Sequence, residues 1–117
     1  MENGVKDKSK KFAVRIIRFC QYLNGEKREY VMSRQILRSG TSIGANIREA
    51  SEGQSKADFI SKMSIALKEA SETEYWLELL YETEYMSAEQ YESMRTDCNE
   101  LVKMLTSIVK TSRQNHN

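Results

Sequence analysis

Apolar residues recur every three or four positions along most of the chain, which is the pattern of amphipathic helices. Short polar links separate four such stretches, and no stretch alternates apolar and polar residues as a half-buried strand does. Five glycines and no proline leave few points at which a helix would have to break. The pattern predicts helices over residues 8–23, 30–52, 56–85 and 88–112.

Each predicted helix carries one apolar stripe for a common core. The longest stripe, in residues 56–85, alternates spacings of four and three without a break, as the seam of a helical bundle does. The stripes comprise Phe12, Ile16, Phe19, Cys20 and Leu23; Ile36, Gly40, Ile43, Ile47 and Ala50; Phe59, Met63, Ala66, Ala70, Thr73, Leu77 and Leu80; and Tyr91, Met94, Cys98, Leu101, Leu105 and Ile108.

Local signals mark several helix ends. Asn24 and Gly25 tolerate a left-handed backbone and are predicted to stop the first helix. Ser55 is spaced to cap the third helix, and Ser87 with Gln90 forms a capping box for the fourth. Because short links make consecutive helices antiparallel, we expect an all-α fold, an up-down-up-down four-helix bundle in a single domain over residues 1–117.

Composition narrows the class of protein. The 117 residues include 18 Lys and Arg against 17 Asp and Glu, and a net charge of +1 argues against a strongly basic nucleic-acid binder. No apolar run approaches the ~20 residues needed to cross a bilayer. The first residues lack the apolar region of a signal peptide. We therefore expect a cytoplasmic protein with no membrane partner.

The residues that usually carry chemistry are sparse. The one histidine, His116, lies in the polar tail, far from any carboxylate pair on a predicted helix. Cys20 and Cys98 fall on apolar stripes, where cysteine behaves as a small buried hydrophobe. The sequence therefore predicts no metal site, no cofactor and no enzymatic activity.

Gly40 and Gly44 lie four residues apart inside the second predicted helix. A phosphate-binding loop would continue with Lys-Ser or Lys-Thr, which is absent here. Glycine within a helix costs about 1 kcal/mol relative to alanine, so a packing reason is expected. We interpret the two glycines as a site where another helix backbone approaches closely.

Charge is divided unevenly along the chain. Residues 1–54 carry 11 basic and 6 acidic side chains, whereas residues 55–117 carry 7 and 11. The basic candidates are Lys8, Lys11, Arg15 and Arg18 in the first helix and Arg34, Arg38 and Arg48 in the second. Two hypotheses follow: these side chains bind the phosphates of RNA or DNA, or they pair with the acidic third or fourth helix of the same or a neighbouring subunit.

A second apolar stripe lies on the back of the third helix. Ile65, Trp76 and Leu79 point away from its main seam, with Tyr75 beside them. A four-helix monomer needs only one buried stripe per helix, and aromatic residues are enriched at protein interfaces. The second stripe therefore predicts self-association.

Residues 33–50, with the core Arg-Ser-Gly-Thr-Ser-Ile-Gly-Ala-Asn-Ile at 38–47, and residues 55–60 and 65–70 resemble a known signature. They are similar to the four-helix bundle proteins encoded in intervening sequences of bacterial 23S rRNA genes, which are also called ribosomal-protein-like. The accessory variability protein of diversity-generating retroelements is similar to that family.

The resemblance implies an antiparallel four-helix protomer that assembles into a ring-shaped homopentamer without enzymatic activity. For the retroelement relatives it also implies a basic surface that binds nucleic acid and a partner protein. Within the matching motif, Ser42 and Asn46 are four residues apart and next to small residues. We expect them to make hydrogen bonds between helices.

Overall fold

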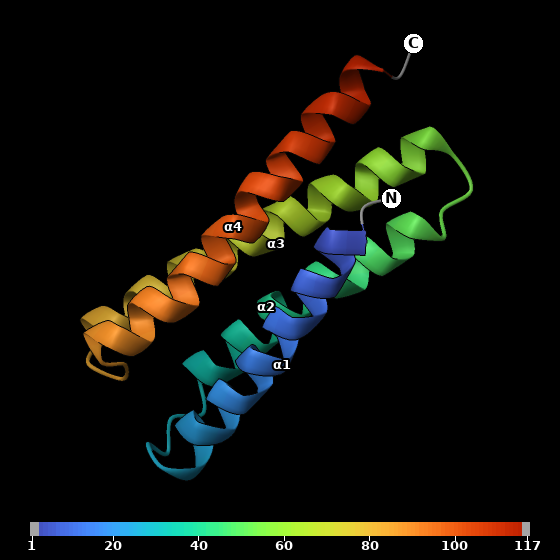
Figure 1. Ribbon diagram of the computed structural model, residues 1–117. Coiled ribbons are helices and arrows are strands. Elements are labelled where there is room, and N and C mark those ends of the chain that lie inside the picture. Colours follow the sequence, from blue (N-terminus) through green and yellow to red (C-terminus); the bar gives the residue numbers. More distant parts are fainter. Residues whose placement is uncertain (1–2, 116–117) are drawn as a thin grey trace.

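A computed structural model describes residues 3–115 as four helices joined by short links (Figure 1). The helices are α1 (Asn3–Gly25), α2 (Met32–Ser51), α3 (Lys56–Glu82) and α4 (Ala88–Gln114). No strand occurs among these residues. The all-α prediction and the number of helices are confirmed.

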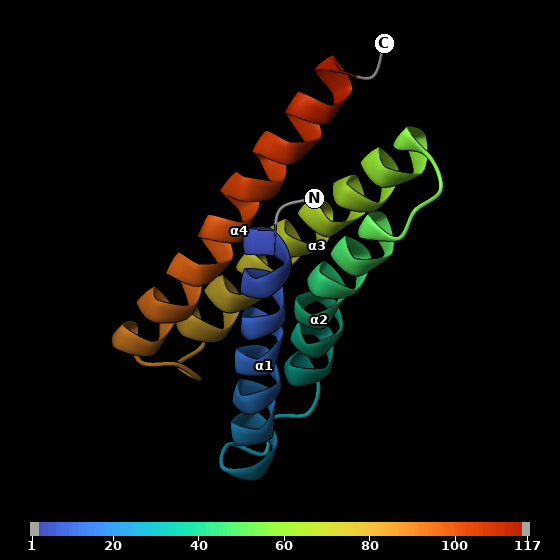
Figure 2. The same ribbon diagram turned by 45° about the vertical axis from the view of Figure 1, so that its right-hand side comes forward.

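Consecutive helices run antiparallel and pack side by side in the order α1, α2, α3, α4 (Figures 1 and 2). α1 and α4 also touch, but over a much shorter stretch, and within residues 3–115 the backbones of the diagonal pairs α1–α3 and α2–α4 nowhere come within 8 Å of each other, measured between Cα atoms. The bundle is elongated, with extents of 50 × 21 × 20 Å. The up-down-up-down arrangement is as predicted.

The core follows the predicted stripes closely. All five stripe residues of α2 are buried, as is the α3 stripe from Met63 to Leu80. In α4 the last core position is Val109, whereas the predicted Ile108 is only partly buried. The first stripe also extends two turns further back, through the buried Ser9 to the fully buried Val5.

Burial of Val5 explains why α1 begins at Asn3 rather than at residue 8. α1 ends at Gly25, two residues later than predicted, but the left-handed stop expected at Asn24 and Gly25 is wrong, because neither residue has a positive φ. Arg28 provides the left-handed residue instead, with φ of 52°. Glycine lowers the cost of that conformation but is not required for it.

The start of α2 is set by a carboxylate that the sequence pattern did not reveal. Glu29 accepts hydrogen bonds from the backbone N–H groups of Val31, Met32 and Ser33 at 2.7–3.1 Å. These N–H groups lack partners inside the helix, and a negative charge there also favours the helix dipole. α2 therefore begins at Met32, two residues later than predicted.

The caps of the last two helices are as expected. Ser55 accepts a hydrogen bond from the N–H of Asp58 at 3.0 Å, and Ser87 with Gln90 forms a complete capping box. α3 ends at Glu82 rather than at residue 85, because Glu84 turns left-handed with φ of 71°. Backbone N–H groups of the turn then donate hydrogen bonds to the last carbonyls of α3, as is typical of helix C-termini.

Two adjacent residues of α2, Ser39 and Gly40, face different neighbouring helices. On the α1 side, a Cβ added to Gly40 would lie 2.8 Å from Cγ1 of Ile16, which is fully buried. On the α3 side, the buried Ser39 accepts a hydrogen bond from the Thr73 hydroxyl at 2.8 Å. One turn on, Gly44 faces Ser9. The geometry at Gly40 and Gly44 confirms that they serve close helix packing.

We expect Gly40→Ala to destabilise the fold and Gly44→Ala not to. The new Cβ at Gly40 overlaps the stiff, buried Ile16, and overpacking of about 1–3 kcal/mol exceeds the roughly 1 kcal/mol gained in helix propensity. At Gly44 the Cβ would meet Ser9 Oγ at 3.4 Å, which is an ordinary contact, so the propensity gain remains. Urea unfolding measures both variants. A Gly40→Ala protein as stable as Gly44→Ala would contradict this account.

Candidate interaction surfaces

The predicted second stripe of α3 lies on the outside of the bundle, and we call Ile65, Tyr75, Trp76 and Leu79 the α3 outer face. Tyr75 is 53% exposed and Ile65 39%, whereas Trp76 and Leu79 are half-buried. The rings of Tyr75 and Trp76 lie 5.5 Å apart, and the indole N–H of Trp76 donates to Glu72 at 3.1 Å. Tyr75, Trp76 and Leu79 thus form one cluster, in which Trp76 also packs against the core, and Ile65 lies about three turns earlier on α3, beyond Glu69 and Glu72.

Carboxylates surround the aromatic end of this face. Glu78 and Glu82 are exposed, three and seven residues after Tyr75, so they lie beside it on the helix surface. Over its whole length α3 carries six acidic and three basic side chains. The α3 outer face is therefore apolar with an acidic margin.

Four of the seven predicted phosphate-binding candidates form ion pairs within the chain. The pairs are Lys8 with Glu100, Lys11 with Asp7, Arg15 with Asp97 at 2.6 Å, and Arg38 with both Glu69 and Glu72. Three of these four side chains reach a neighbouring helix. These three side chains therefore pair with α3 or α4 of the same subunit, as the second hypothesis expected.

The other three candidates are Arg18, Arg34 and Arg48. They are exposed, and within residues 3–115 none forms an ion pair. Arg18 contacts only the Gln21 side chain, at 3.5 Å. They lie on two helices and belong to separate parts of the surface, so the structure does not gather the seven candidates into one patch.

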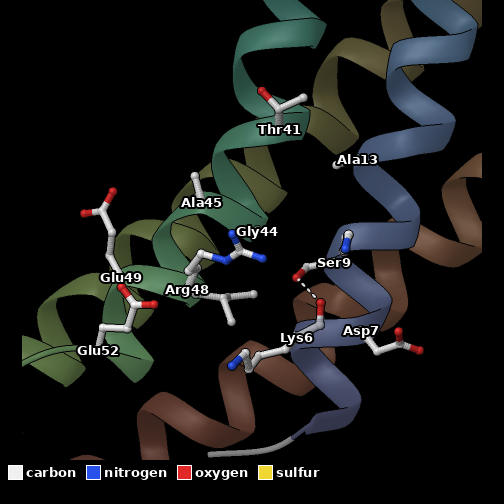
Figure 3. A pocket seen from close by; sticks show the side chains of 12 residues that line it. Lys6, Asp7, Ser9, Ala13, Thr41, Gly44, Ala45, Arg48, Glu49 and Glu52 are labelled. Atoms are coloured by element: carbon white, nitrogen blue, oxygen red, sulfur yellow. Dashed lines mark hydrogen bonds between the residues drawn. The ribbon is translucent and has the colours of Figure 1, made fainter.

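One groove of about 620 Å³ lies between the N-terminal half of α1 and the C-terminal half of α2. Small residues, including Ala13, Gly44 and Ala45, form part of its wall. Figure 3 shows the Arg48 side chain extending from α2 into the space between the helices, with Lys6 on the α1 side. Sequence reasoning named Arg48 but missed Lys6 and Lys10, which also line this groove.

The walls of this α1/α2 groove also carry three carboxylates. Asp7 pairs with Lys11 at 3.1 Å and Glu49 with Lys62 at 3.1 Å, and the Glu49 hydrogen bond raises the pKa of Lys62. Both carboxylates thus pair with lysines other than Lys6 and Lys10. Glu52 is the remaining acid of the groove.

A second groove, of about 420 Å³, lies between the C-terminal half of α1 and the start of α4. In Figures 1 and 2 the two helices diverge toward this end, and the groove occupies the place where they separate. We call it the α1/α4 groove. It is lined by Val14, Arg15, Arg18, Phe19, Tyr22, Met86, Gln90 and Met94.

Comparison with known proteins places the chain in a family. The profile described as "23S rRNA-intervening sequence protein" matches residues 1–107. The chain belongs to this family. No curated protein matches it.

A solved structure is similar to this family member over most of its length. It is the 1.70 Å crystal structure of a protein of unknown function from the S23 ribosomal protein family of Bacteroides thetaiotaomicron VPI-5482. The two chains are 65% identical, with a TM-score of 0.91, and the match covers 92% of this chain and 96% of that one. The fold implied by the sequence resemblance is therefore confirmed, and that relative has no stated function.

The signature motif of the family does not make the hydrogen bonds predicted for it. The Ser42 hydroxyl donates to the carbonyl of Arg38 at 2.6 Å, and the Asn46 amide donates to that of Ser42 at 2.8 Å. Both bonds stay inside α2, because each side chain finds a carbonyl one turn earlier. The buried polar contact between helices is made instead by Ser39 and Thr73.

Both cysteines of this family member are buried free thiols. Cys20 donates to the carbonyl of Ser33 and Cys98 to that of Ala70, each at 3.3 Å. Burial raises the pKa of Cys20 to about 11 and that of Cys98 to about 12. His116 lies outside the described residues, and within residues 3–115 no cluster of metal-binding side chains occurs. No helix there is long and apolar enough to span a membrane.

The thiols are expected to resist a disulfide reagent at pH 8 until the protein unfolds. Only the thiolate reacts, and the raised pKa values keep both groups protonated. Because the ordinary thiol pKa is 9.0, the unfolded state loses these protons first, so the free energy of unfolding falls as the pH rises above about 9. The reaction is followed by the absorbance of the coloured thiolate that the reagent releases, with and without denaturant. Rapid labelling of the native protein would contradict the burial.

Proposed function

We propose that this protein is a non-enzymatic, homo-oligomeric assembly module whose first partner is a second copy of itself. The observation that carries the proposal is the α3 outer face. Tyr75, Trp76 and Leu79 lie within about one turn of α3 on the outside of the bundle, and Ile65 lies about three turns earlier; of the four, Trp76 also packs against the core.

Free energy favours covering this face. Removing apolar surface from water gains roughly 25 cal/mol per Å², and aromatic side chains offer the largest areas. Ile65 and Tyr75 remain more than a third exposed in the isolated chain. A tyrosine beside a tryptophan is also the composition typical of binding hot spots.

A closed ring is the assembly we expect, with five subunits as the family resemblance implies. Symmetry would then repeat each surface of the bundle around the ring and multiply weak contacts to a further protein or nucleic acid. An adaptor role follows from that repetition. We also propose a reducing compartment such as the cytoplasm, which suits two free thiols.

Catalysis has no part in the proposal. The two thiols are protonated and hydrogen-bonded to backbone carbonyls, so neither is poised as a nucleophile. Rigid helices with a repeated surface are well suited to holding other molecules in place.

Tyr75→Arg is expected to break the assembly, because it replaces the most exposed ring of the α3 outer face by a charge. Tyr30→Arg is the matched control: Tyr30 is also 53% exposed but lies in the link between α1 and α2. Light scattering after size exclusion measures the mass. The proposal fails if the wild type runs at the 13.6 kDa of one chain, or if Tyr75→Arg assembles as the control does.

Nucleic-acid binding is a second candidate function, favoured by the α1/α2 groove. Lys6, Lys10 and Arg48 line it from two helices, and Figure 3 shows Lys6 and Arg48 on the α1 and α2 sides of the groove. Around a ring, one such groove per subunit would supply avidity without a high net charge. We propose RNA or DNA phosphates as its ligand and the backbone, rather than the bases, as the feature recognised.

Titration with labelled RNA at two salt concentrations tests this candidate. The double variant Lys10→Glu/Arg48→Glu is expected to weaken binding at least tenfold and to flatten its salt dependence, because phosphate contacts release counterions. Lys110→Glu, an exposed charge on α4, is the control and should have a small effect. Affinity that is absent at low salt, or equal in both variants, would count against the groove.

A further inference from the structure

Opposite corners of the bundle carry opposite charge. α1 has six basic side chains and one acidic side chain, whereas α3 has three basic and six acidic. These two helices occupy diagonal positions, and within residues 3–115 their Cα atoms do not come within 8 Å of each other. Their charges therefore attract weakly inside one chain and remain available, in part, to a second copy.

The α1/α4 groove is apolar inside and basic at its edge. Phe19 and Tyr22, whose rings lie 6.4 Å apart, form part of the floor. Val14 is 48% exposed at the margin, although it is a large apolar side chain. Arg18 also lines the groove and makes no ion pair among the described residues, so its charge faces solvent.

The α3 outer face has the complementary properties. It presents the exposed ring of Tyr75 with Leu79 one turn further along, and Glu78 and Glu82 flank that pair. An aromatic stripe with an acidic margin thus matches an apolar groove with a basic margin. The two surfaces lie on different sides of the same molecule.

We infer that the α3 outer face of one subunit docks into the α1/α4 groove of the next, with Tyr75 entering beside Val14 and with Glu78 and Glu82 facing Arg18. This inference rests on the proposed self-assembly and adds which surfaces meet. The contact is head-to-tail, so every subunit contributes its α3 outer face on one side and its groove on the other.

Charge also argues against the simplest alternative, a two-fold contact between two α3 outer faces. Such a contact would bring Glu78 and Glu82 of one copy against the same carboxylates of the other, and like charges oppose association. Docking into the groove sets those carboxylates against Arg18 instead. A guanidinium next to an aromatic ring adds a favourable cation–π contact.

Two variants separate the surfaces. Val14→Glu/Arg18→Glu disrupts the groove, and Tyr75→Glu disrupts the α3 outer face; all three positions are exposed, so both proteins should fold, and the two altered surfaces repel each other. Each variant alone is expected to be monomeric in sedimentation experiments. Their mixture is expected to form a 1:1 dimer, because each partner keeps the surface that the other lacks. Circular dichroism and melting temperature confirm folding.

Disulfide capture gives a second measurement on the otherwise unchanged chain, whose own cysteines are buried. Under oxidation, Val14→Cys mixed with Tyr75→Cys should yield a cross-linked dimer, and neither protein should cross-link by itself. A protein that carries only Lys110→Cys, on α4, is the control for disulfides formed by random collision.

The outcomes are distinct. A monomeric wild type would overturn the proposed function and this inference together. An oligomeric wild type whose groove variant still assembles, or whose Tyr75→Cys variant cross-links with itself, would overturn only the head-to-tail contact. Absence of both the mixed dimer and the Val14–Tyr75 cross-link would do the same.

Discussion

The close approach of α1 to α2 at Gly40 is the constraint on which the bundle most depends. Ile16 lies where a side chain of residue 40 would begin, so any larger residue there must displace the Ile16 side chain. The neighbouring Ser39 fixes the other side of α2 through its buried hydrogen bond with Thr73. Two consecutive residues thus contact both neighbouring helices, and the bond between Ser39 and Thr73 favours one register of α2 against α3.

This constraint has a consequence at the far side of α1. Because α1 packs along α2 over most of its length, its C-terminal half follows α2 and diverges from the start of α4. Ion pairs from Lys8 and Arg15 hold α1 to α4 only further toward its N-terminus. Exposed pairs of this kind contribute about 0–1 kcal/mol each, too little to close the bundle against the tighter contact. The α1/α4 groove is the space that remains.

Periodicity was sufficient for the four helices, since each stripe is long and unbroken, and local chemistry was sufficient for the capping box at Ser87. Periodicity was insufficient for Val5, which lies in register seven residues before Phe12, because the polar Ser9 interrupts the apolar spacing between them. Glu29 could not be recognised as a cap while α2 was thought to begin before Met32. Pairs such as Lys8 with Glu100 depend on which face α1 turns toward α4, and that rotation is decided by packing at Gly40. The grooves between helices depend on the same rotation, so the sequence pattern does not reveal them.

The net charge of +1 conceals an arrangement in which α1 and α3, at opposite corners, differ in sign. In the contact we propose, the α3 outer face of one subunit enters the groove between α1 and α4 of the next. Because α4 is also the neighbour of α3, this groove does not lie directly opposite the α3 outer face. The two docking surfaces are then turned by less than half a revolution about the bundle axis. Each added subunit rotates in the same sense, so the array curves, and such a head-to-tail array closes into a ring where the rotation per subunit divides a full turn and winds into a helical filament where it does not.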